Sequence, residues 1–211
     1  MSSTQGIYSL AKLREAYSKG LRFNFVFFLN YNDKDLELDP VTKGCLSQFF
    51  PSNFHDKEGH KFTSCIQYMM SQKAVLFNDR ESLRAIMNSN DQNKMKQIGR
   101  GIQNFDDSIW QERSIEIVYQ GNLYKFSQFN KLYDYILSFP ENTVFVEANP
   151  SDNVWGIGLS SKDKQALNPN EWRGENNLGF QITRVRDTFL KSTYNGQIYS
   201  YAYHDFIHQV N

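Results

Sequence analysis

Two short runs, FNFVFFLNY at residues 23–31 and TVFVEAN at residues 143–149, are the clearest strand candidates in this chain of 211 residues. Both are rich in the β-branched and aromatic residues that suit a pleated, half-buried surface. A short third strand is expected between Gly59 and Thr63. Strands are therefore a minor part of the expected fold.

Helical patterns occupy most of the remaining chain. Apolar spacing and capping residues predict helices over residues 8–19, 64–77, 80–88, 91–99, 108–120, 126–137 and 178–190. Gly99 is expected to end the fourth of these helices, and Asp106 or Asp107 to cap the fifth. Proline and glycine residues favour turns between residues 149 and 177. The sequence therefore predicts a single helix-rich α+β domain over residues 1–211, with a few short strands.

The charge balance limits the partners of this chain. It has 23 Lys and Arg side chains and 23 Asp and Glu side chains, which gives a formal net charge of zero. A protein that binds duplex DNA by neutralising phosphates normally has a basic excess or a basic face. The balance argues against strong nonspecific binding to nucleic acid, but it does not exclude a local basic pocket.

The two cysteines, Cys45 and Cys65, form no C-x-x-C pair and have no histidine pair nearby. We expect two buried free thiols in a reducing compartment, and neither a disulfide nor a zinc site. No metal is expected from the histidines, because none of them shows a metal-ligand spacing (His55, His60, His204 and His208).

No apolar run approaches the roughly 18 residues that a membrane-spanning helix needs. The first twenty or so residues also lack the apolar centre of a signal peptide. We therefore expect a cytoplasmic protein with no membrane association, and we infer no obligate protein partner.

Four stretches of the chain match the motifs of one known family in order and spacing. They are LSQFFPSNF (46–54), SCIQYMMSQKAVLFND (64–79), IGRGIQNFDDSIWQERSIEIV (98–118) and a block over 146–189 that contains VEANPSDNVWGIGL and NPNEWRGENNLGFQITRVRD. They resemble the motifs F-S-N-F-Y-P-S-P-F, S-x-E-Q/H-Y-x-x-x-x-K-A, G-R-x-V-x-x-F-D-x-x-x-W-x-x-x-R and V-E-A-S-P-x-D-x-x-W-G-I-G-L of the NADAR/YbiA-like family of ribose-linked N-glycosidases. The resemblance is strongest over residues 46–190, and residues 1–45 are expected to form an N-terminal extension packed on the domain.

The resemblance implies an α+β domain that cleaves a bond between a ribose anomeric carbon and a nitrogen, with no metal or organic cofactor. Some members act on phosphoribosyl intermediates of riboflavin synthesis. Others remove ADP-ribose from guanine in nucleotides or DNA and so reverse a toxin's modification. The expected partner of this chain is therefore an ADP-ribose-containing nucleotide or ADP-ribosylated DNA, with the ADP-ribose on a guanine.

The family's catalytic candidates are a helix glutamate, the tryptophan of F-D-x-x-x-W and the aspartate of P-x-D-x-x-W-G. These positions hold Ile66, Trp110 and Asp152. Cleavage develops positive charge at the anomeric carbon, which a carboxylate such as Asp152 can stabilise, or the carboxylate can activate the attacking water. An aspartate in a turn more often holds its own backbone, and a tryptophan on an apolar stripe is usually core; the resemblance favours the functional interpretation of both.

Basic side chains are the candidates for binding phosphate. Lys73 lies two helical turns after Ile66 on an otherwise apolar face, where an unpaired ammonium is costly to bury. We expect it to contact phosphate or a carboxylate; a lysine that extends to solvent is the alternative. Arg113 suits a planar anion or pairs with an acid, and Arg100 after Gly99 fits an anion-binding turn.

The block over residues 146–189 supplies further candidates for substrate binding. Glu147 is either a second carboxylate of the site or the partner of an arginine. Trp155, Gly156 and Asn176 are expected to shape a tight loop near the pocket.

Isoleucine at position 66 can neither transfer a proton nor stabilise an oxocarbenium ion. The chain is then an inactive variant that traps a ligand, a binder that has kept the pocket without the chemistry, or an enzyme in which Asp152, with Glu147, suffices. The sequence alone leaves these three alternatives open.

Overall fold

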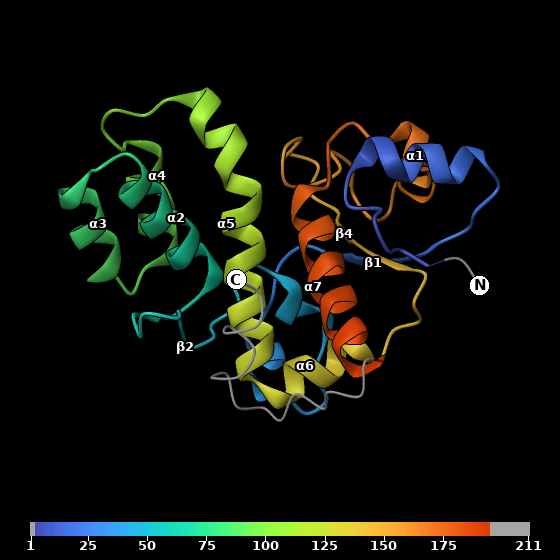
Figure 1. The fold of residues 1–211 in the computed structure, drawn as a ribbon, viewed down its shortest axis with the longest axis horizontal. Helices are drawn as coiled ribbons and strands as arrows, with labels where there is room; N and C mark the ends of the chain where they lie inside the picture. The colour runs from blue at the N-terminus through green and yellow to red at the C-terminus, as the bar shows by residue number, and fades with distance from the viewer. Residues whose placement is uncertain (1–2, 195–211) are drawn as a thin grey trace. The chain divides into compact units, whose positions relative to one another are not determined.

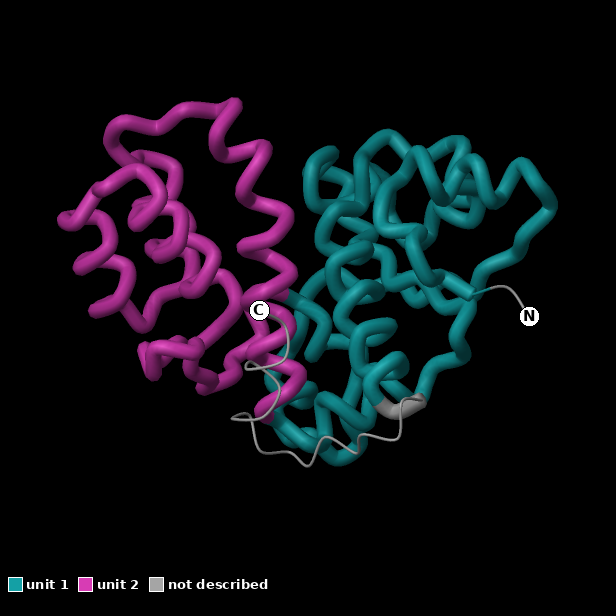
Figure 2. The backbone as a smooth tube through the Cα atoms, in the orientation of Figure 1, with its two compact units in different colours: residues 1–47, 129–211 teal, residues 48–128 magenta. Residues whose placement is uncertain are grey.

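The structure is a computed structural model that describes residues 3–194. Its helices outnumber its short strands, so the predicted helix-rich α+β class is confirmed (Figure 1). Contacts divide the chain into unit 1, residues 1–47 and 129–211, and unit 2, residues 48–128 (Figure 2). The single domain over residues 1–211 stays a prediction, and His204 and His208 lie outside the described residues.

Unit 1 is organised around a parallel pair of strands, β1 (Asn24–Phe28) and β4 (Thr143–Glu147). Their register pairs Asn24 with Thr143 and Phe28 with Glu147. The three central residues of β4 are fully buried, as expected for a strand covered on both faces. The N-terminal segment therefore contributes one of the two strands of this unit.

Helices α1 (Leu10–Ser18), α6 (Asn130–Leu137) and α7 (Asn177–Tyr194) complete unit 1, and α7 packs on β4 (Figure 1). Apolar side chains from α1, β4 and the following loop share one core with Trp172 and Phe180. Four short 3-10 helices lie in the connecting segments (Asp33–Glu37, Lys43–Leu46, Lys164–Leu167 and Pro169–Glu171).

Unit 2 contains a small hairpin, β2 (Phe54–His55) and β3 (Lys61–Phe62), followed by four helices. These are α2 (Cys65–Leu76), α3 (Arg80–Met87), α4 (Gln92–Arg100) and α5 (Asp107–Gln128). Side chains of Ser64, Asp79 and Asp91 cap the first three helices by accepting main-chain N–H groups. Helix α2 packs against all three of the other helices.

Helices α4 and α5 continue past their predicted ends, and each passes through a glycine at or next to that end. Helix α5 continues through Gly121, where the prediction ended it at residue 120, because a Cβ there would lie 2.7 Å from the ring of Tyr68. Helix α4 likewise continues through Gly99, where a Cβ would lie 2.1 Å from the sulfur of Met70. These glycines allow close helix packing and do not end a helix. Helix α6 accordingly begins at Asn130, four residues later than predicted.

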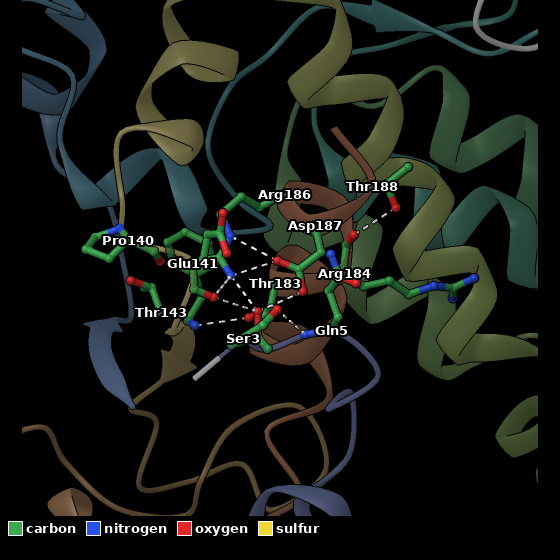
Figure 3. Close-up of polar contacts among 12 residues, drawn as sticks. Ser3, Gln5, Pro140, Glu141, Thr143, Thr183, Arg184, Arg186, Asp187 and Thr188 are labelled. Atoms are coloured by element: carbon green, nitrogen blue, oxygen red, sulfur yellow. Dashed lines mark hydrogen bonds and ion pairs between the residues drawn. The ribbon is translucent and has the colours of Figure 1, made fainter. Parts of the chain in front are cut away.

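A buried ion pair within α7 is hydrogen-bonded to the N-terminal segment of unit 1 (Figure 3). Arg186 is fully buried and donates from Nη2 to Asp187 Oδ1 at 2.7 Å and to Thr4 Oγ1 at 2.7 Å. Asp187 Oδ2 accepts from Thr4 and from the hydroxyl of Tyr8, at 2.7 and 3.1 Å. Arg186 also donates to the main-chain carbonyl of Glu141 before β4. Both carboxylate oxygens of Asp187 thus accept hydrogen bonds from within unit 1.

Cys45 and Cys65 are buried free thiols, as predicted. Burial raises the pKa of the Cys65 thiol to about 11, so this group is protonated at neutral pH. Within residues 3–194, none of the helices combines the length and the apolar character that crossing a membrane requires.

Candidate active site

Asp152 lies in the loop that follows β4. Its Oδ1 accepts the main-chain N–H groups of Val154 and Trp155 at 2.9 and 2.7 Å. This is the Asx-turn geometry that the sequence left open as the structural role. Within residues 3–194, Oδ2 takes part in no hydrogen bond. One oxygen therefore fixes the orientation of the carboxylate, and the other is left without a hydrogen bond in the described residues.

Close main-chain contacts pack the Asp152 loop tightly. A Cβ on Gly156 would lie 2.9 Å from the carbonyl oxygen of Glu147 and 3.1 Å from that of Asp152. A Cβ on Gly174 would lie 2.4 Å from the carbonyl oxygen of Gly156. Because no other side chain fits at these two positions, the loop is held against both β4 and the segment before α7.

Asn176 connects this loop to the strand. Its buried amide donates from Nδ2 to the carbonyl of Phe145 at 3.0 Å and accepts the N–H of Glu147 at Oδ1 at 2.9 Å. Its main-chain N–H donates to Gly156. The structure thus brings Glu147, Asp152, Trp155, Gly156 and Asn176 together, and Asn176 holds the end of β4 through both of its amide atoms.

Ile66 occupies the second position of α2 and is only 4 % exposed. Its main-chain N–H donates to the carbonyl of Gln48 at 3.0 Å. The side-chain amide of Gln48 donates from Nε2 to Asn122 Oδ1 at 3.2 Å, and its own Oε1 is buried with no hydrogen-bond partner within residues 3–194. The isoleucine is therefore buried, and its main chain is hydrogen-bonded to a residue whose side-chain oxygen is unsatisfied within residues 3–194.

Lys73 and Trp110 come together in unit 2. The Nζ atom of Lys73 lies 5.2 Å from the centroid of the Trp110 ring and 4.1 Å from that of Phe105. It donates to the carbonyl of Gly99 at 2.8 Å. Partial burial lowers the pKa of the Lys73 ammonium, and the charge of Asp107 opposes this effect only in part.

Arg100 and Arg113 are both exposed. Arg100 is the last residue of α4, so the anion-binding turn expected after Gly99 is a helix end instead. Arg113 follows Trp110 by three residues on α5, which places the two side chains on neighbouring positions of the helix surface. Each guanidinium is open to solvent, and neither takes part in the contacts that hold Lys73.

Comparison with known proteins identifies the family. A model of the NADAR domain matches residues 30–190. The chain belongs to the NADAR domain family. The match begins at residue 30, so it includes part of the segment before residue 46 but not β1.

Two proteins with sequence similarity to this NADAR chain come from distant sources. The mimivirus protein N-glycosidase R617, from Acanthamoeba polyphaga mimivirus, is 39 % identical over 145 residues, which are 67 % of this chain and 85 % of the relative. Protein irg-1 of Caenorhabditis elegans is 33 % identical over 156 residues, 67 % of this chain and 73 % of the relative.

Among solved structures, the fold is similar to that of the Escherichia coli protein YbiA, determined by NMR. The TM-score is 0.63 at 17 % sequence identity, and the match covers 82 % of this chain and 89 % of YbiA. At this identity the likeness establishes the YbiA-like fold and nothing about residue roles.

Two residues near the NADAR candidates were not singled out from the sequence. Phe105 stands directly before the Asp106–Asp107 pair, within the quoted F-D-x-x-x-W motif, so the motif itself was the available signal. Gln48 stands where the family loop has asparagine, and only the structure shows its unsatisfied oxygen. The roles of all the site residues stay predictions.

The hairpin of unit 2 brings ligand atoms of Asp56, Glu58 and His60 within 4.8 Å of one another. Asp56 Oδ1 accepts the N–H groups of Glu58 and His60 at 3.0 and 2.8 Å, and Oδ2 lies 2.9 Å from His60 Nδ1. Both oxygens of the buried Asp56 carboxylate are therefore in contact with residues of the turn between β2 and β3.

Proposed function

We propose that this NADAR chain hydrolyses a ribosyl–base N-glycosidic bond, and that its substrate is an ADP-ribosylated guanine in a nucleotide or in DNA. The relative named N-glycosidase, at 39 % identity over 145 residues, supports membership of a ribose-linked N-glycosidase family. The guanine adduct is the finer part of the proposal, and it follows from the motif resemblance. Removal of ADP-ribose would reverse a modification of the nucleotide, as an antitoxin does. The expected cytoplasmic location stays a prediction.

The carboxylate of Asp152 carries the proposal. Its loop fixes it through Oδ1 and leaves Oδ2 for the reaction. As the glycosidic bond breaks, positive charge develops at the anomeric carbon, and a preoriented carboxylate stabilises that charge without reorganising. The same oxygen can instead accept a proton from the attacking water. Atoms balance with water alone, because its hydroxide joins the anomeric carbon and its proton leaves with the base.

Trp110 and Lys73 have binding roles in the proposal. The indole provides an apolar wall for the departing base, since aromatic faces stack on flat rings. The ammonium of Lys73 attracts a phosphate of the ADP-ribose group. Arg100 and Arg113 are exposed guanidinium groups that suit the same anion. These roles follow from side-chain chemistry and await measurement.

A second function is favoured by one observation, the buried isoleucine at position 66. Without the family's glutamate, the chain would bind ADP-ribose or a related nucleotide and release it unchanged. The 4 % exposure of Ile66 shows that this position contributes apolar packing. A protein that only binds the nucleotide shows no turnover, whereas a glycosidase does, so an assay of ADP-ribose release separates the two functions.

The deciding experiment incubates the purified protein with ADP-ribosylated guanosine, and separately with the same adduct in a DNA oligonucleotide, and follows released ADP-ribose by mass spectrometry. Asp152→Ala, Asp152→Asn and Ile66→Glu are assayed beside the native chain. The proposal predicts release by the native chain and a loss of about 100-fold or more in both Asp152 variants. Tight binding without release, with turnover gained in Ile66→Glu, would establish the capture protein instead.

A further inference from the structure

Phe105 is an aromatic side chain that unit 2 leaves open to solvent. It is 43 % exposed, although it lies in the motif that also contains Trp110. Its ring contacts Phe77 edge to face, with centroids 5.2 Å apart and planes at 66°. The buried Phe77 therefore fixes the orientation of the Phe105 ring and leaves much of its surface uncovered.

The ammonium of Lys73 lies over this ring, with Nζ 4.1 Å from the centroid. Its hydrogen bond goes to the carbonyl of Gly99, and in the described part of the chain Nζ forms no ion pair with a carboxylate. The positive charge is held by a carbonyl dipole and by the faces of two rings. Such a cation–π contact is worth about 0.5 to 2 kcal/mol, depending on its desolvation.

A single exposed apolar residue carries no meaning by itself. Ile109, on the same segment, is also 43 % exposed but has no aromatic ring. Phe105 differs because it combines an oriented ring, an open surface and an ammonium that forms no ion pair within the described residues. A ligand that is flat and also bears negative charge would satisfy all three features together.

We propose that Phe105 is a specificity-determining residue that stacks on the purine base of the ligand, while Lys73 beside it attracts the ligand's phosphate. This inference rests on the proposed function, because it names the residue that recognises the base in the same reaction. It assigns Phe105 to binding, not to bond cleavage. Base stacking on an aromatic side chain contributes about 1 to 3 kcal/mol, which corresponds to about 5- to 150-fold in affinity.

The test measures binding of guanosine 5′-monophosphate and of ribose 5-phosphate by titration calorimetry. Phe105→Ala and Phe105→Leu are expected to bind the nucleotide about tenfold more weakly, and Phe105→Tyr to retain native affinity, because leucine lacks the flat ring that tyrosine keeps. Affinity for ribose 5-phosphate should be the same in all four proteins. Ile109→Ala is the matched control, with equal exposure and no ring, and should bind the nucleotide like the native chain.

Equal affinity of Phe105→Leu and the native chain for the nucleotide would overturn the inference, as would an equal loss for ribose 5-phosphate. So would a native chain that does not bind the nucleotide. Where the native chain turns over ADP-ribosylated guanosine, the Phe105→Ala variant should show KM about tenfold higher and an unchanged kcat. A ring-dependent affinity in a chain without turnover would support Phe105 as the base-binding residue and reject only the proposed hydrolysis.

Discussion

The ammonium of Lys73 lies 2.8 Å from the carbonyl oxygen of Gly99, which is inside helix α4. Gly99 can present its carbonyl there because α4 approaches α2 so closely that a Cβ would meet the sulfur of Met70. The packing of two helices thus sets the position of an ammonium that lies over two aromatic rings. A change at Lys73 should therefore alter ligand binding directly, and a change at Gly99 should act through the packing of α4 against α2.

Replacement of Lys73 by methionine should weaken binding of ribose 5-phosphate about tenfold, because it removes the ammonium and keeps the apolar stem. Burial lowers the pKa of Lys73, so the ammonium deprotonates at a lower pH than an exposed lysine. Affinity in the native chain should therefore fall on the alkaline side, beginning below the usual lysine range. Titration calorimetry across that range checks this, and a Lys73→Met variant with the same pH profile would contradict it.

Gly99→Ala should destabilise unit 2 by about 1 to 3 kcal/mol, because the added methyl overpacks the contact between α2 and α4. A Cβ there would lie 2.1 Å from the sulfur of Met70. Gly101→Ala is the matched control, because its Cβ would meet only the carbonyl of Ile98 at 3.7 Å. Urea unfolding of both variants measures the difference. Equal stabilities would show that α4 can move away from α2 without loss.

Asp152→Asn separates the structural use of this side chain from its proposed chemistry. Asparagine keeps an oxygen that accepts the N–H groups of Val154 and Trp155, so the free energy of unfolding should stay within about 0.5 kcal/mol of the native value. Asp152→Ala loses both hydrogen bonds and should be less stable by about 1 to 2 kcal/mol. Both variants should lose turnover. Full activity in Asp152→Asn would show that Asp152 only supports its loop.

Local patterns in the sequence predicted most of the secondary structure. The caps at Ser64 and Asp91 and the aromatic runs of β1 and β4 mark their elements directly. Gly99 misled the prediction because a glycine that ends a helix and one that admits a neighbouring helix look alike in one sequence. Only the partner side chain, Met70, distinguishes the two cases.

The candidate site was less accessible to sequence reasoning than the fold. The motifs identified Asp152 and Trp110, but they did not reveal that Asp152 commits one oxygen to its own loop. The F-D-x-x-x-W motif contains Phe105, but it did not reveal the contact of this ring with the Lys73 ammonium, which is 32 positions away in the chain. Contacts between side chains far apart in sequence leave no trace in local spacing.

Stability at alkaline pH should depend on Tyr8. Burial raises the pKa of its hydroxyl to about 12, and the carboxylate of Asp187 adds to the effect. Between about pH 10 and about pH 12 the folded chain therefore holds a proton that the unfolded chain has released, so the free energy of unfolding falls as pH rises. Tyr8→Phe should flatten this decline. Part of it should remain, because the pKa values of Tyr124 and Tyr135 are also raised. Urea unfolding at several pH values tests this; an unchanged slope in Tyr8→Phe would contradict it.

The ion pair of Arg186 and Asp187 predicts strongly non-additive effects on stability. Arg186→Met leaves the buried Asp187 carboxylate without its cation, which should lower the free energy of unfolding by about 3 to 5 kcal/mol. Adding Asp187→Asn removes the uncompensated charge and keeps an acceptor for Thr4 and Tyr8, so the double variant should be more stable than Arg186→Met alone. Arg173→Met, at an exposed arginine of the same unit, should change stability by less than about 0.5 kcal/mol. Additive losses in the urea unfolding of the single and double variants would show that the two charges do not depend on each other.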